Sequence, residues 1–495
     1  METFLIRAIQ LILSLSILVV LHEFGHFAFA RLFKVRVEKF YMFFNPNFSL
    51  IRAKKINGKW DIKLLAKNIP VNERPKLDAD GDNMVDSNGK SIMEHIPLSE
   101  LPEGDWRKYP ENTEWGIGWL PLGGYCSISG MVDETKDINQ LSAEPESWEY
   151  RSRSVWQRLP IITGGVFVNF ILAMAIYSAV LFTWGQEYIP IKDAKYGFQF
   201  SQTLLNSGFR NGDKIVRIDG LPVEGRKDVV EMILIDGKQT VTVLRDSQLI
   251  DLKLPSDIAQ KILAANEKDF VSIRFPFVVE EVSAGSPAEK AKLQGGDSII
   301  GINGNQLFIF QDIAAKLDSS KNATIALNIV RNGKPLIAKL QLDDKGKLGV
   351  GVRPDYKFLN TKKIEYSFFG SIPAGINLGW ETLTSYVKQF KLVFTKEGSK
   401  QVGGFGSIGK LFPKAWDWQI FWSMTALLSV ILAFMNILPI PALDGGYVMF
   451  LIYEIITGKK PNDKFLEYAQ TVGMVLLFGL LLFANGNDIF KAIFK

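Results

Sequence analysis

The chain contains few residues of the kinds that crosslink a protein or bind transition metals. Its 495 residues include three histidines and a single cysteine, Cys126. One cysteine excludes an intramolecular disulfide and any zinc site built from several thiolates. Since no spare histidine is left to activate its thiol, we expect Cys126 to be a packed residue and not a nucleophile.

A strong excess of charge is also missing. Lys and Arg number 57 and Asp and Glu number 52, which gives a formal net charge of +5. This excess is small for the length, and no basic stretch with interleaved aromatic residues is present, so nucleic acid is not expected as a partner. Hydrophobic residues make up 47% of the chain, and this fraction predicts that part of it lies in a lipid bilayer.

Four apolar segments are each close to the roughly 20 residues that a helix needs to cross a hydrocarbon core. They cover about residues 4–33, 160–184, 420–443 and 465–485. The first lacks a small-residue cleavage site and is too long for a signal peptide, so we expect a retained helix. Lys and Arg gather after the first segment, before the second and between the third and fourth, and these flanks are therefore expected on the cytoplasmic side. Both termini and residues 189–370 would then face the other side.

Two of the three histidines lie in one pentapeptide of the first apolar segment, His22-Glu-Phe-Gly-His26. Residues four apart share one face of a helix, so His22 and His26 can bind one metal ion, and Glu23 between them can activate a water molecule. Ionisable groups inside a span cost roughly 2.5–3.5 kcal/mol each on insertion scales, and they tend to persist where they serve a site. The pentapeptide therefore predicts a Zn²⁺ site within the membrane.

A catalytic zinc ion usually has three protein ligands, so a third is needed, and a carboxylate is expected. The third apolar segment ends in Asn436-Ile-Leu-Pro-Ile-Pro-Ala-Leu-Asp-Gly-Gly446. Its prolines predict an extended stretch, and its glycines permit a tight turn. At about 1.5 Å per residue, His22 lies roughly 27 Å along the first helix, and Asp444 lies similarly far along a parallel third helix. Asp444 is the expected third ligand; a glutamate from a loop is the alternative.

The region between the second and third segments repeats itself. Residues 208–220 align with 293–304, so that Asp213 and Asp219 recur as Asp297 and Asn303. Alternating strands follow at 240–244 and 324–330. A repeat of this length predicts a duplicated domain and not a solenoid.

Each copy combines a Gly-Asp turn, an apolar strand and Asp-Gly or Asn-Gly, a pattern that resembles PDZ domains. The second copy adds Ser286-Pro-Ala-Glu-Lys-Ala291. PDZ domains usually bind an extended peptide at a sheet edge. Extended peptides are therefore candidate ligands, and steric filtering without a bound peptide is the alternative.

The region after the first segment contains a polar insert at 70–115 and, before it, the strand-like alternation of 59–65. The acidic run 78–86 hints at calcium, but the glycine and the final glutamate of an EF-hand loop are missing, so a solvated loop is expected. His95 is expected to be a surface residue.

The two metal motifs together resemble those of the site-2 protease family, the intramembrane zinc metalloproteases. The family pairs His-Glu-x-x-His in a first span with Asn-x-x-Pro-x-Pro-x-Leu-Asp-Gly in a third. Pro121-Leu-Gly-Gly-Tyr125 and Gly164-Gly-Val-Phe-Val-Asn169 are similar to further family motifs. With two PDZ-like domains between the second and third spans, the resemblance extends to the bacterial branch that contains the regulator of sigma-E protease.

The resemblance implies hydrolysis of peptide bonds within or near the transmembrane segment of single-span membrane proteins already trimmed on their outer side. Anti-sigma factors and remnant signal peptides are the implied substrates, and the PDZ pair would exclude bulky untrimmed proteins. Glu23 would take a proton from water at the zinc ion and pass it to the leaving amine. The implied location is the bacterial inner membrane, with periplasmic PDZ domains and the active site near the cytoplasmic side.

Four further residues are candidates for binding the substrate or the developing oxyanion: Asn436, Asn169, Pro439 and Pro441. An interhelical hydrogen bond is the alternative role for each asparagine. Two other functions remain open. One is a non-catalytic membrane scaffold with peptide-binding PDZ domains, and the other is a different membrane-integrated zinc peptidase.

The predicted fold is a multi-span α-helical membrane protein with a membrane-associated β-hairpin and two PDZ-like α/β domains. The predicted parts are a first transmembrane helix (1–34), a cytoplasmic or membrane-associated region with strands (35–158), a second helix (159–185), two PDZ-like domains (189–275 and 276–356), an amphipathic or linker region (360–415), a third span (420–444) and a fourth (465–485).

Overall fold

The computed structural model describes residues 2–68, 73–75, 84, 93–121, 123–131, 145–188, 190, 194–267, 269–352 and 362–494. The acidic run 78–86 lies outside the described residues, apart from Met84. The chain divides into two compact units. The first unit comprises Met1–Trp184, Tyr366–Tyr386 and Val402–Lys495, and the second comprises Gly185–Glu365 and Val387–Gln401.

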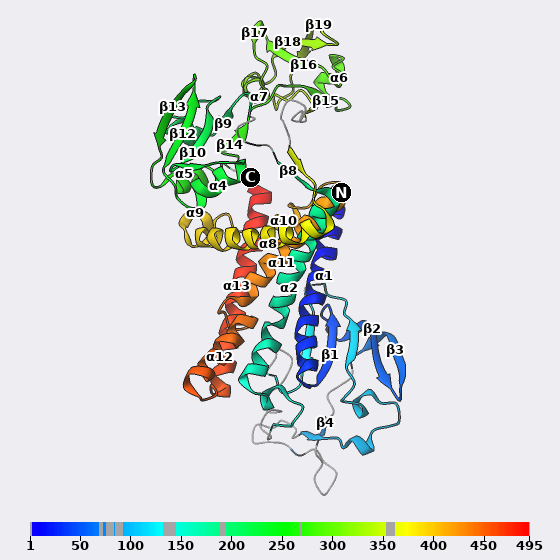
Figure 1. The fold of residues 1–495 in the computed structure, drawn as a ribbon. Coiled ribbons are helices and arrows are strands. Elements are labelled where there is room, and N and C mark those ends of the chain that lie inside the picture. Colours follow the sequence, from blue (N-terminus) through cyan, green and yellow to red (C-terminus); the bar gives the residue numbers. More distant parts are fainter. Residues whose placement is uncertain are drawn as a thin grey trace. The chain divides into compact units, whose positions relative to one another are not determined.

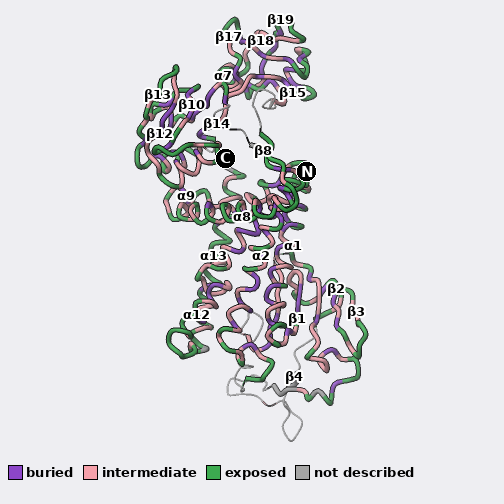
Figure 2. The backbone as a smooth tube through the Cα atoms, in the orientation of Figure 1, coloured by how far each residue is buried: buried purple, intermediate pink, exposed green. Residues whose placement is uncertain are grey.

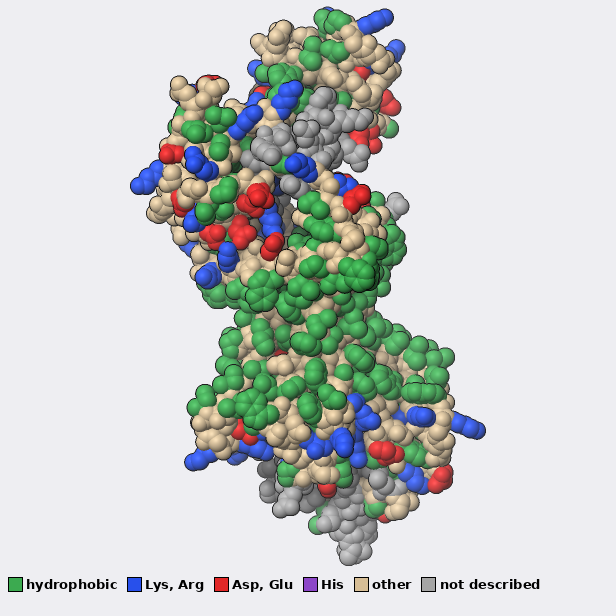
Figure 3. Space-filling view, in the orientation of Figure 1, with side chains coloured by type: hydrophobic (Ala, Val, Ile, Leu, Met, Phe, Trp, Pro, Cys, Tyr) green, Lys and Arg blue, Asp and Glu red, His purple; other side chains and the backbone are tan. Residues whose placement is uncertain are grey.

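In the described part of the first unit, four helices are long and apolar enough to cross a membrane. They are α1 (Glu2–Leu32), α2 (Val155–Trp184), α11 (Trp418–Ile437) and α13 (Asp463–Phe494). In lipid, backbone N–H and C=O groups must pair within the chain, which is why such apolar runs form helices. Helices α1, α2 and α11 pack against one another along the bundle (Figure 1). Hydrophobic side chains cover the surface of this helical part, and Lys and Arg side chains gather next to it (Figure 3).

A close contact between glycines joins α1 to α2. A Cβ atom built on Gly25 would lie 2.3 Å from the carbonyl oxygen of Gly164. The two backbones therefore touch, an approach that small residues allow between membrane helices. This crossing brings the face of α1 that carries His22 and His26 against α2.

The third predicted span ends earlier than expected, because residues 438–443 are a non-helical connection to a further helix. Helix α11 ends at Ile437, and α12 (Asp444–Thr457) begins at Asp444 itself. Proline cannot donate a backbone hydrogen bond, so the connection between them leaves the helical path. Ala442 within it has a φ angle of 77°, a left-handed conformation that is costly for a residue with a side chain. Asp444 is thus the start of a helix and not the end of a span.

A five-stranded sheet in the order β3-β2-β6-β1-β7 lies beside α1 (Figure 1). Its strands are β1 (Val37–Met42), β2 (Phe48–Ile56), β3 (Lys59–Lys67), β6 (Glu114–Ile117) and β7 (Tyr125–Ile128). Strands β1 and β6 are parallel, and the other neighbours are antiparallel. Strand β7 forms one edge and packs against α1, whereas β3 forms the opposite edge.

Short elements complete this region. They are β4 (Glu73–Pro75), β5 (Met93–His95), η1 (Leu98–Glu100), η2 (Trp106–Lys108) and η4 (Tyr150–Ser152). His95 is the last residue of β5, which pairs with β4. The backbone coloured by burial shows buried positions where α1, α2 and β1 meet, and exposed positions along β3 (Figure 2).

The two copies of the repeated sequence fold alike in the second unit. Their sheets have the orders β11-β10-β12-β13 and β17-β16-β18-β19, with a register shift at the equivalent positions Ile215 and Ile299. The strands of the first sheet are β10 (Lys214–Ile218), β11 (Leu221–Pro222), β12 (Thr240–Arg245) and β13 (Gln248–Lys253). Those of the second are β16 (Ser298–Ile302), β17 (Asn305–Gln306), β18 (Thr324–Arg331) and β19 (Lys334–Gln341).

Each copy has its own hydrophobic core and a separate pair of strands. These pairs are β9 (Phe198–Phe200) with β14 (Val271–Ile273), and β15 (Val279–Val282) with β20 (Val350–Val352). The helical elements are α3 (Gln202–Leu205), α4 (Arg226–Val230), η6 (Glu231–Ile235), α5 (Ile258–Ala264), α6 (Pro287–Lys290) and α7 (Phe310–Asp318).

The remaining elements lie before the first repeat or between the second repeat and the third span. They are β8 (Gln186–Tyr188), which pairs with β21 (Lys362–Ile364), then α8 (Phe368–Phe390), η7 (Lys391–Phe394), α9 (Lys396–Ser399) and α10 (Phe405–Gly409). Helix α8 runs across the helical bundle and not along it (Figure 1). Its apolar side chains Phe369 and Trp380 are exposed, as expected for a helix at a membrane surface.

Candidate metal centre

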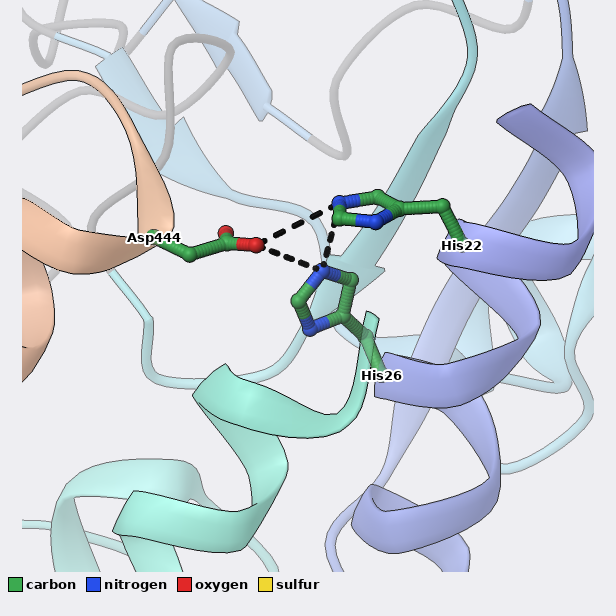
Figure 4. Close-up of side chains that lie close together, drawn as sticks. All are labelled: His22, His26 and Asp444. Carbon is green, nitrogen blue, oxygen red and sulfur yellow. Dashed lines mark hydrogen bonds and ion pairs between the residues drawn. The ribbon is translucent and has the colours of Figure 1, made fainter. Parts of the chain in front are cut away.

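Two side chains of α1 and one side chain of α12, over 400 residues later in the sequence, converge between these helices. Oδ2 of Asp444 lies 3.3 Å from Nε2 of His22 and 3.5 Å from Nε2 of His26. The two Nε2 atoms are 3.3 Å apart. Figure 4 shows Asp444 pointing from α12 toward both imidazole rings of α1. The structure therefore brings together the three residues that the sequence predicted as ligands.

This triangle of atoms fits a zinc ion. Ligand atoms held 2.0–2.1 Å from a tetrahedral zinc ion lie about 3.3–3.4 Å from one another, close to the distances observed here. Oδ2 of Asp444 is buried and accepts no hydrogen bond of normal geometry among the described residues, so this oxygen is available to a cation. The donor set of two imidazoles and one carboxylate is one that catalytic zinc sites use.

The second nitrogen of each imidazole is held by α2. Nδ1 of His26 lies 2.9 Å from the backbone oxygen of Ile161, so it carries the proton and donates it to this carbonyl group. Nδ1 of His22 faces the side-chain amide of Asn169, with Nδ2 at 3.1 Å. A hydrogen bond at Nδ1 leaves Nε2 as the metal-binding atom.

The contact between Asn169 and His22 becomes a hydrogen bond when the Asn169 side-chain amide is flipped, so that Oδ1 and Nδ2 exchange places. Oδ1 of Asn169 is buried and has no hydrogen-bond partner among the described residues. An amide is nearly symmetric in shape, and the turned group places Oδ1 where it accepts the proton of His22 Nδ1. Asn169 is fully buried, and its backbone oxygen accepts a hydrogen bond from Ser429 of α11. This asparagine is therefore positioned to orient His22.

Glycine is required where α2 passes the imidazoles. A Cβ atom on Gly165 would lie 2.5 Å from Nε2 of His26 and 2.6 Å from Cε1 of His22. Such a contact would displace both rings. The backbone carbonyl of Ile161 is marked by no motif. Gly165 lies in the Gly164–Asn169 motif, but that motif did not indicate a contact with the imidazoles.

The start of α12 fixes the carboxylate. Asp444 lies in the first turn, where the positive end of the helix dipole favours a negative charge. The next two residues are buried glycines, and a Cβ atom on Gly445 would lie 2.1 Å from the backbone oxygen of Leu438. The Asp-Gly-Gly sequence is therefore explained by the tight return of the chain after the proline stretch.

Glu23 is half-buried beside His22 on α1. The backbone N–H of Cys126, on the edge strand β7, donates a hydrogen bond to its carboxylate. Gly124, just before that strand, packs against α1, because its Cβ atom would lie 2.9 Å from Val19 Cγ1 and 3.6 Å from Glu23 Cγ. Cys126 thus contributes a backbone group, which sequence reasoning missed because every residue except proline carries an N–H.

The other candidates lie at different distances from this centre. Nδ2 of Asn436, at the end of α11, is 3.2 Å from Nε2 of His22. Pro439 is exposed. Pro441 packs against glycines, since its backbone oxygen would lie 1.8 Å from a Cβ atom on Gly473 of α13. The two asparagines therefore join the cluster, and Pro441 contacts neighbouring helices.

Comparison with known proteins shows likeness over most of the chain. The profile of Peptidase family M50 matches residues 10–67 and 105–480. The regulator of sigma-E protease RseP of Escherichia coli K12 is 26% identical over 518 residues, which cover 99% of each chain. A Vibrio cholerae protein named as a candidate zinc metalloprotease is 25% identical over 511 residues, with 97% of each chain covered.

Among solved structures, a PDZ domain of an SdrC-like protein from Listeria monocytogenes is 24% identical, with a TM-score of 0.15. It covers 16% of this chain and 90% of its own. The family match spans far more than half of the sequence and includes both metal motifs. The predicted family membership is confirmed: the chain belongs to peptidase family M50 and is a membrane peptidase.

Proposed function

We propose that this protein is a zinc-dependent intramembrane endopeptidase in which His22, His26 and Asp444 hold the metal ion. The observation that carries the proposal is the triangle of ligand atoms with edges of 3.3, 3.3 and 3.5 Å. Both histidines direct Nδ1 toward partners on α2. The names of similar proteins, which include candidate zinc metalloproteases, support the choice of zinc.

When bound, the zinc ion polarises a peptide carbonyl and makes water more acidic. Glu23 accepts the proton of the attacking water and then protonates the leaving amine. The hydrogen bond from the Cys126 N–H holds the carboxylate in place without filling both of its oxygens. Asn436 lies next to His22 at the C-terminal end of α11 and is proposed to bind the developing oxyanion. Asn169 is buried and is proposed to orient His22.

A substrate helix has its backbone groups paired internally, so it must unwind before hydrolysis. A sheet edge can pair with an unwound segment, and β3 and β7 are the edge strands of the five-stranded sheet. Strand β3 includes residues 59–65, whose alternation predicted a strand, whereas β7 packs on α1 and donates a hydrogen bond from the Cys126 N–H to Glu23. We infer that β3 offers the edge that pairs with the scissile segment. The extended stretch with Pro439 is a second candidate.

The proposed substrates are single-span membrane proteins already trimmed on their outer side, including anti-sigma factors and remnant signal peptides. The likeness to the E. coli regulator of sigma-E protease supports this class. The repeats at 189–275 and 276–356 are proposed to be PDZ-like domains that either bind extended peptides or exclude untrimmed proteins. The proposed location is the bacterial inner membrane, with these domains in the periplasm and the metal centre near the cytoplasmic side.

A cleavage assay with matched variants tests the proposal. The substrate is a single-span reporter without an outer domain, and metal content is measured on the purified full-length protein. Glu23→Gln should retain the metal and lose cleavage by at least about a hundredfold, the lower range for losing a general base. Asp444→Asn should lose both the metal and cleavage.

The two alternatives predict other results. A non-catalytic scaffold cleaves nothing and binds peptides equally well in all three proteins. A different zinc peptidase with a glutamate ligand keeps its metal in Asp444→Asn. Equal cleavage by the wild type and Glu23→Gln would refute the proposed role of Glu23.

A further inference from the structure

A second cavity lies in the first unit, away from the metal centre. It has a volume of about 260 Å³ and is bounded by the start of α2, the later turns of α12 and the start of α13. Its charged lining residues are Arg151, Arg158, Glu454 and Lys460. Two of the basic flanks noted in the sequence, before the second span and between the third and fourth, therefore meet in one place. Nζ of Lys460 donates to the backbone oxygen of Arg151 at 3.2 Å.

Among the described residues that line the cavity, the charges do not balance. Arg158 forms an ion pair of 2.6 Å with Glu454, and Arg151 forms one of 2.5 Å with Glu149. Lys460 has no carboxylate within ion-pair distance among the described residues. Nε of Arg158 is buried and has no hydrogen-bond partner in the described part of the chain, although the side chain is 8% exposed. One cation and one buried N–H donor therefore remain for an anion.

Apart from Gln470, the rest of the lining is apolar or aromatic. Met131, Phe450, Leu451 and Leu466 contribute to the wall. Close to these lining residues in sequence, the side chains of Ile456, Phe465 and Tyr468 are exposed by 59–77%. Phe465 and Tyr468 belong to α13, one of the helices apolar enough to cross a membrane. Such a wall suits the glycerol and first acyl carbons of a lipid better than a fully hydrated ion. In the space-filling view, Lys and Arg side chains gather at the border of the hydrophobic belt (Figure 3).

We propose that this cavity binds the phosphate-bearing headgroup of an anionic phospholipid. Basic pockets between membrane helices recognise such headgroups, because the cations attract the phosphate while the acyl chains stay in the bilayer. Lys460 supplies the uncompensated charge, and the Nε–H of Arg158 supplies a directed donor. Tyr447 and Gln470 are both lining residues and hydrogen-bond to each other. This hydrogen bond joins α12 to α13.

The site is connected to the metal centre by one helix. Tyr447, Leu451 and Glu454 follow Asp444 on α12 at intervals of three, seven and ten residues. A bound headgroup would hold α12 against α2 and α13 and so stabilise the position of Asp444. This second step rests on the proposed function, because it assumes that Asp444 is a metal ligand.

Lipid retention by the full-length protein tests the binding site directly. The protein is reconstituted in phosphatidylcholine nanodiscs with a graded fraction of phosphatidylglycerol, and lipids that remain bound after release are counted by native mass spectrometry. We expect Lys460→Gln to weaken retention of phosphatidylglycerol about fivefold, the effect of one cation near an anionic headgroup. Lys459→Gln, one residue away, exposed and not part of the lining, should stay within about twofold of the wild type.

A paired variant removes the buried donor without leaving an unpaired charge. Arg158→Gln combined with Glu454→Gln should also weaken retention, while thermal unfolding of the protein shows whether the helices still pack. Excess inorganic phosphate and glycerol 3-phosphate are added in separate arms. Displacement of the lipid by these soluble anions at millimolar concentration would show a site for a soluble phosphate and overturn the proposal. Equal effects of Lys460→Gln and Lys459→Gln, or no effect of either, would also overturn it.

Cleavage measurements then separate this proposal from the proposed function. If phosphatidylglycerol raises cleavage in the wild type but not in Lys460→Gln, the headgroup acts through α12. If neither protein cleaves but the wild type retains the lipid selectively, the lipid site stands and the proposed peptidase function fails.

Discussion

At the residue scale, hydrogen bonds with α2 orient both imidazoles of the proposed metal centre. His26 is fixed by the backbone oxygen of Ile161 and His22 by Asn169, both on α2. Partners of this kind set the tautomer of the ring and increase the basicity of the ligating nitrogen. Asn169 is therefore better described as a positioning residue than as a substrate-binding residue.

Replacement of Asn169 tests this role. Asn169→Leu keeps the volume but leaves Nδ1 of His22 without a partner, so we expect zinc affinity to fall about 10- to 100-fold, as for other outer partners of metal ligands. Zinc affinity is measured by competition with a chelator, and cleavage at saturating zinc is measured in parallel. At saturating zinc, KM should be nearly unchanged. Unchanged zinc affinity with a raised KM would instead show that Asn169 binds substrate.

Sequence reasoning predicted the ligand residues but not the groups that orient them. His22 and His26 follow from helical spacing, and Asp444 follows from its depth in an apolar segment broken by prolines. Ile161 and Cys126 contribute backbone groups, which every sequence offers at almost every position. Gly165 matters because of a contact across two helices, and local periodicity does not encode such a contact.

At the element scale, the two repeats share an ion pair that the sequence alignment did not include. Arg245 donates two hydrogen bonds to Asp213, and Arg331 does the same to Asp297. In each copy the arginine also donates to a backbone oxygen, of Gly208 in the first and Lys292 in the second. Asp213 and Asp297 were recognised as equivalent in sequence. Their partners lie over 30 residues later in the sequence, at the ends of β12 and β18.

The second pair predicts a pH-dependent contribution to stability. Burial alone would raise the pKa of Asp297, but hydrogen bonds from Arg331 and the Gln294 N–H bring it below its ordinary value. A lowered pKa in the folded state means that the contribution is complete above the unfolded pKa of about 3.9 and is lost as the pH falls through the folded value. Arg331→Gln should therefore destabilise the second repeat at pH 7, and the loss of stability should shrink as the pH falls and Asp297 becomes protonated.

Hydrogen exchange of full-length protein measures this effect, with each variant compared to the wild type at the same pH. Protection of β16 and β18 should fall in Arg331→Gln. The difference in protection between this variant and the wild type should narrow below about pH 4. Arg245→Gln is the matched control and should affect β10 and β12 instead. If either variant lost protection equally in both repeats, the inference that each repeat is stabilised by its own core would be contradicted.

At the scale of the whole molecule, one chain combines four helices suited to a membrane with a duplicated domain inserted between the second and third of them. The sequence predicted this order because apolar length and internal repetition are properties of the sequence. It predicted a break at the prolines but not that a separate helix, α12, begins at Asp444, because a proline-broken end can leave a membrane helix or begin a new one. Asp444 at the start of α12 shows that this chain begins a new one.

The function of the inserted repeats is tested by their removal. The variant has residues 189–356 replaced by a flexible linker. If the repeats act as a size filter, we expect this variant to cleave an untrimmed substrate with a folded outer domain. The ratio of untrimmed to trimmed cleavage rates should then rise at least about tenfold, a change in discrimination of about 1.4 kcal/mol. Trimmed substrate should be cleaved at an unchanged rate. If the repeats instead capture peptides that promote cleavage, the trimmed substrate loses rate and the untrimmed one gains none, and the filter is refuted.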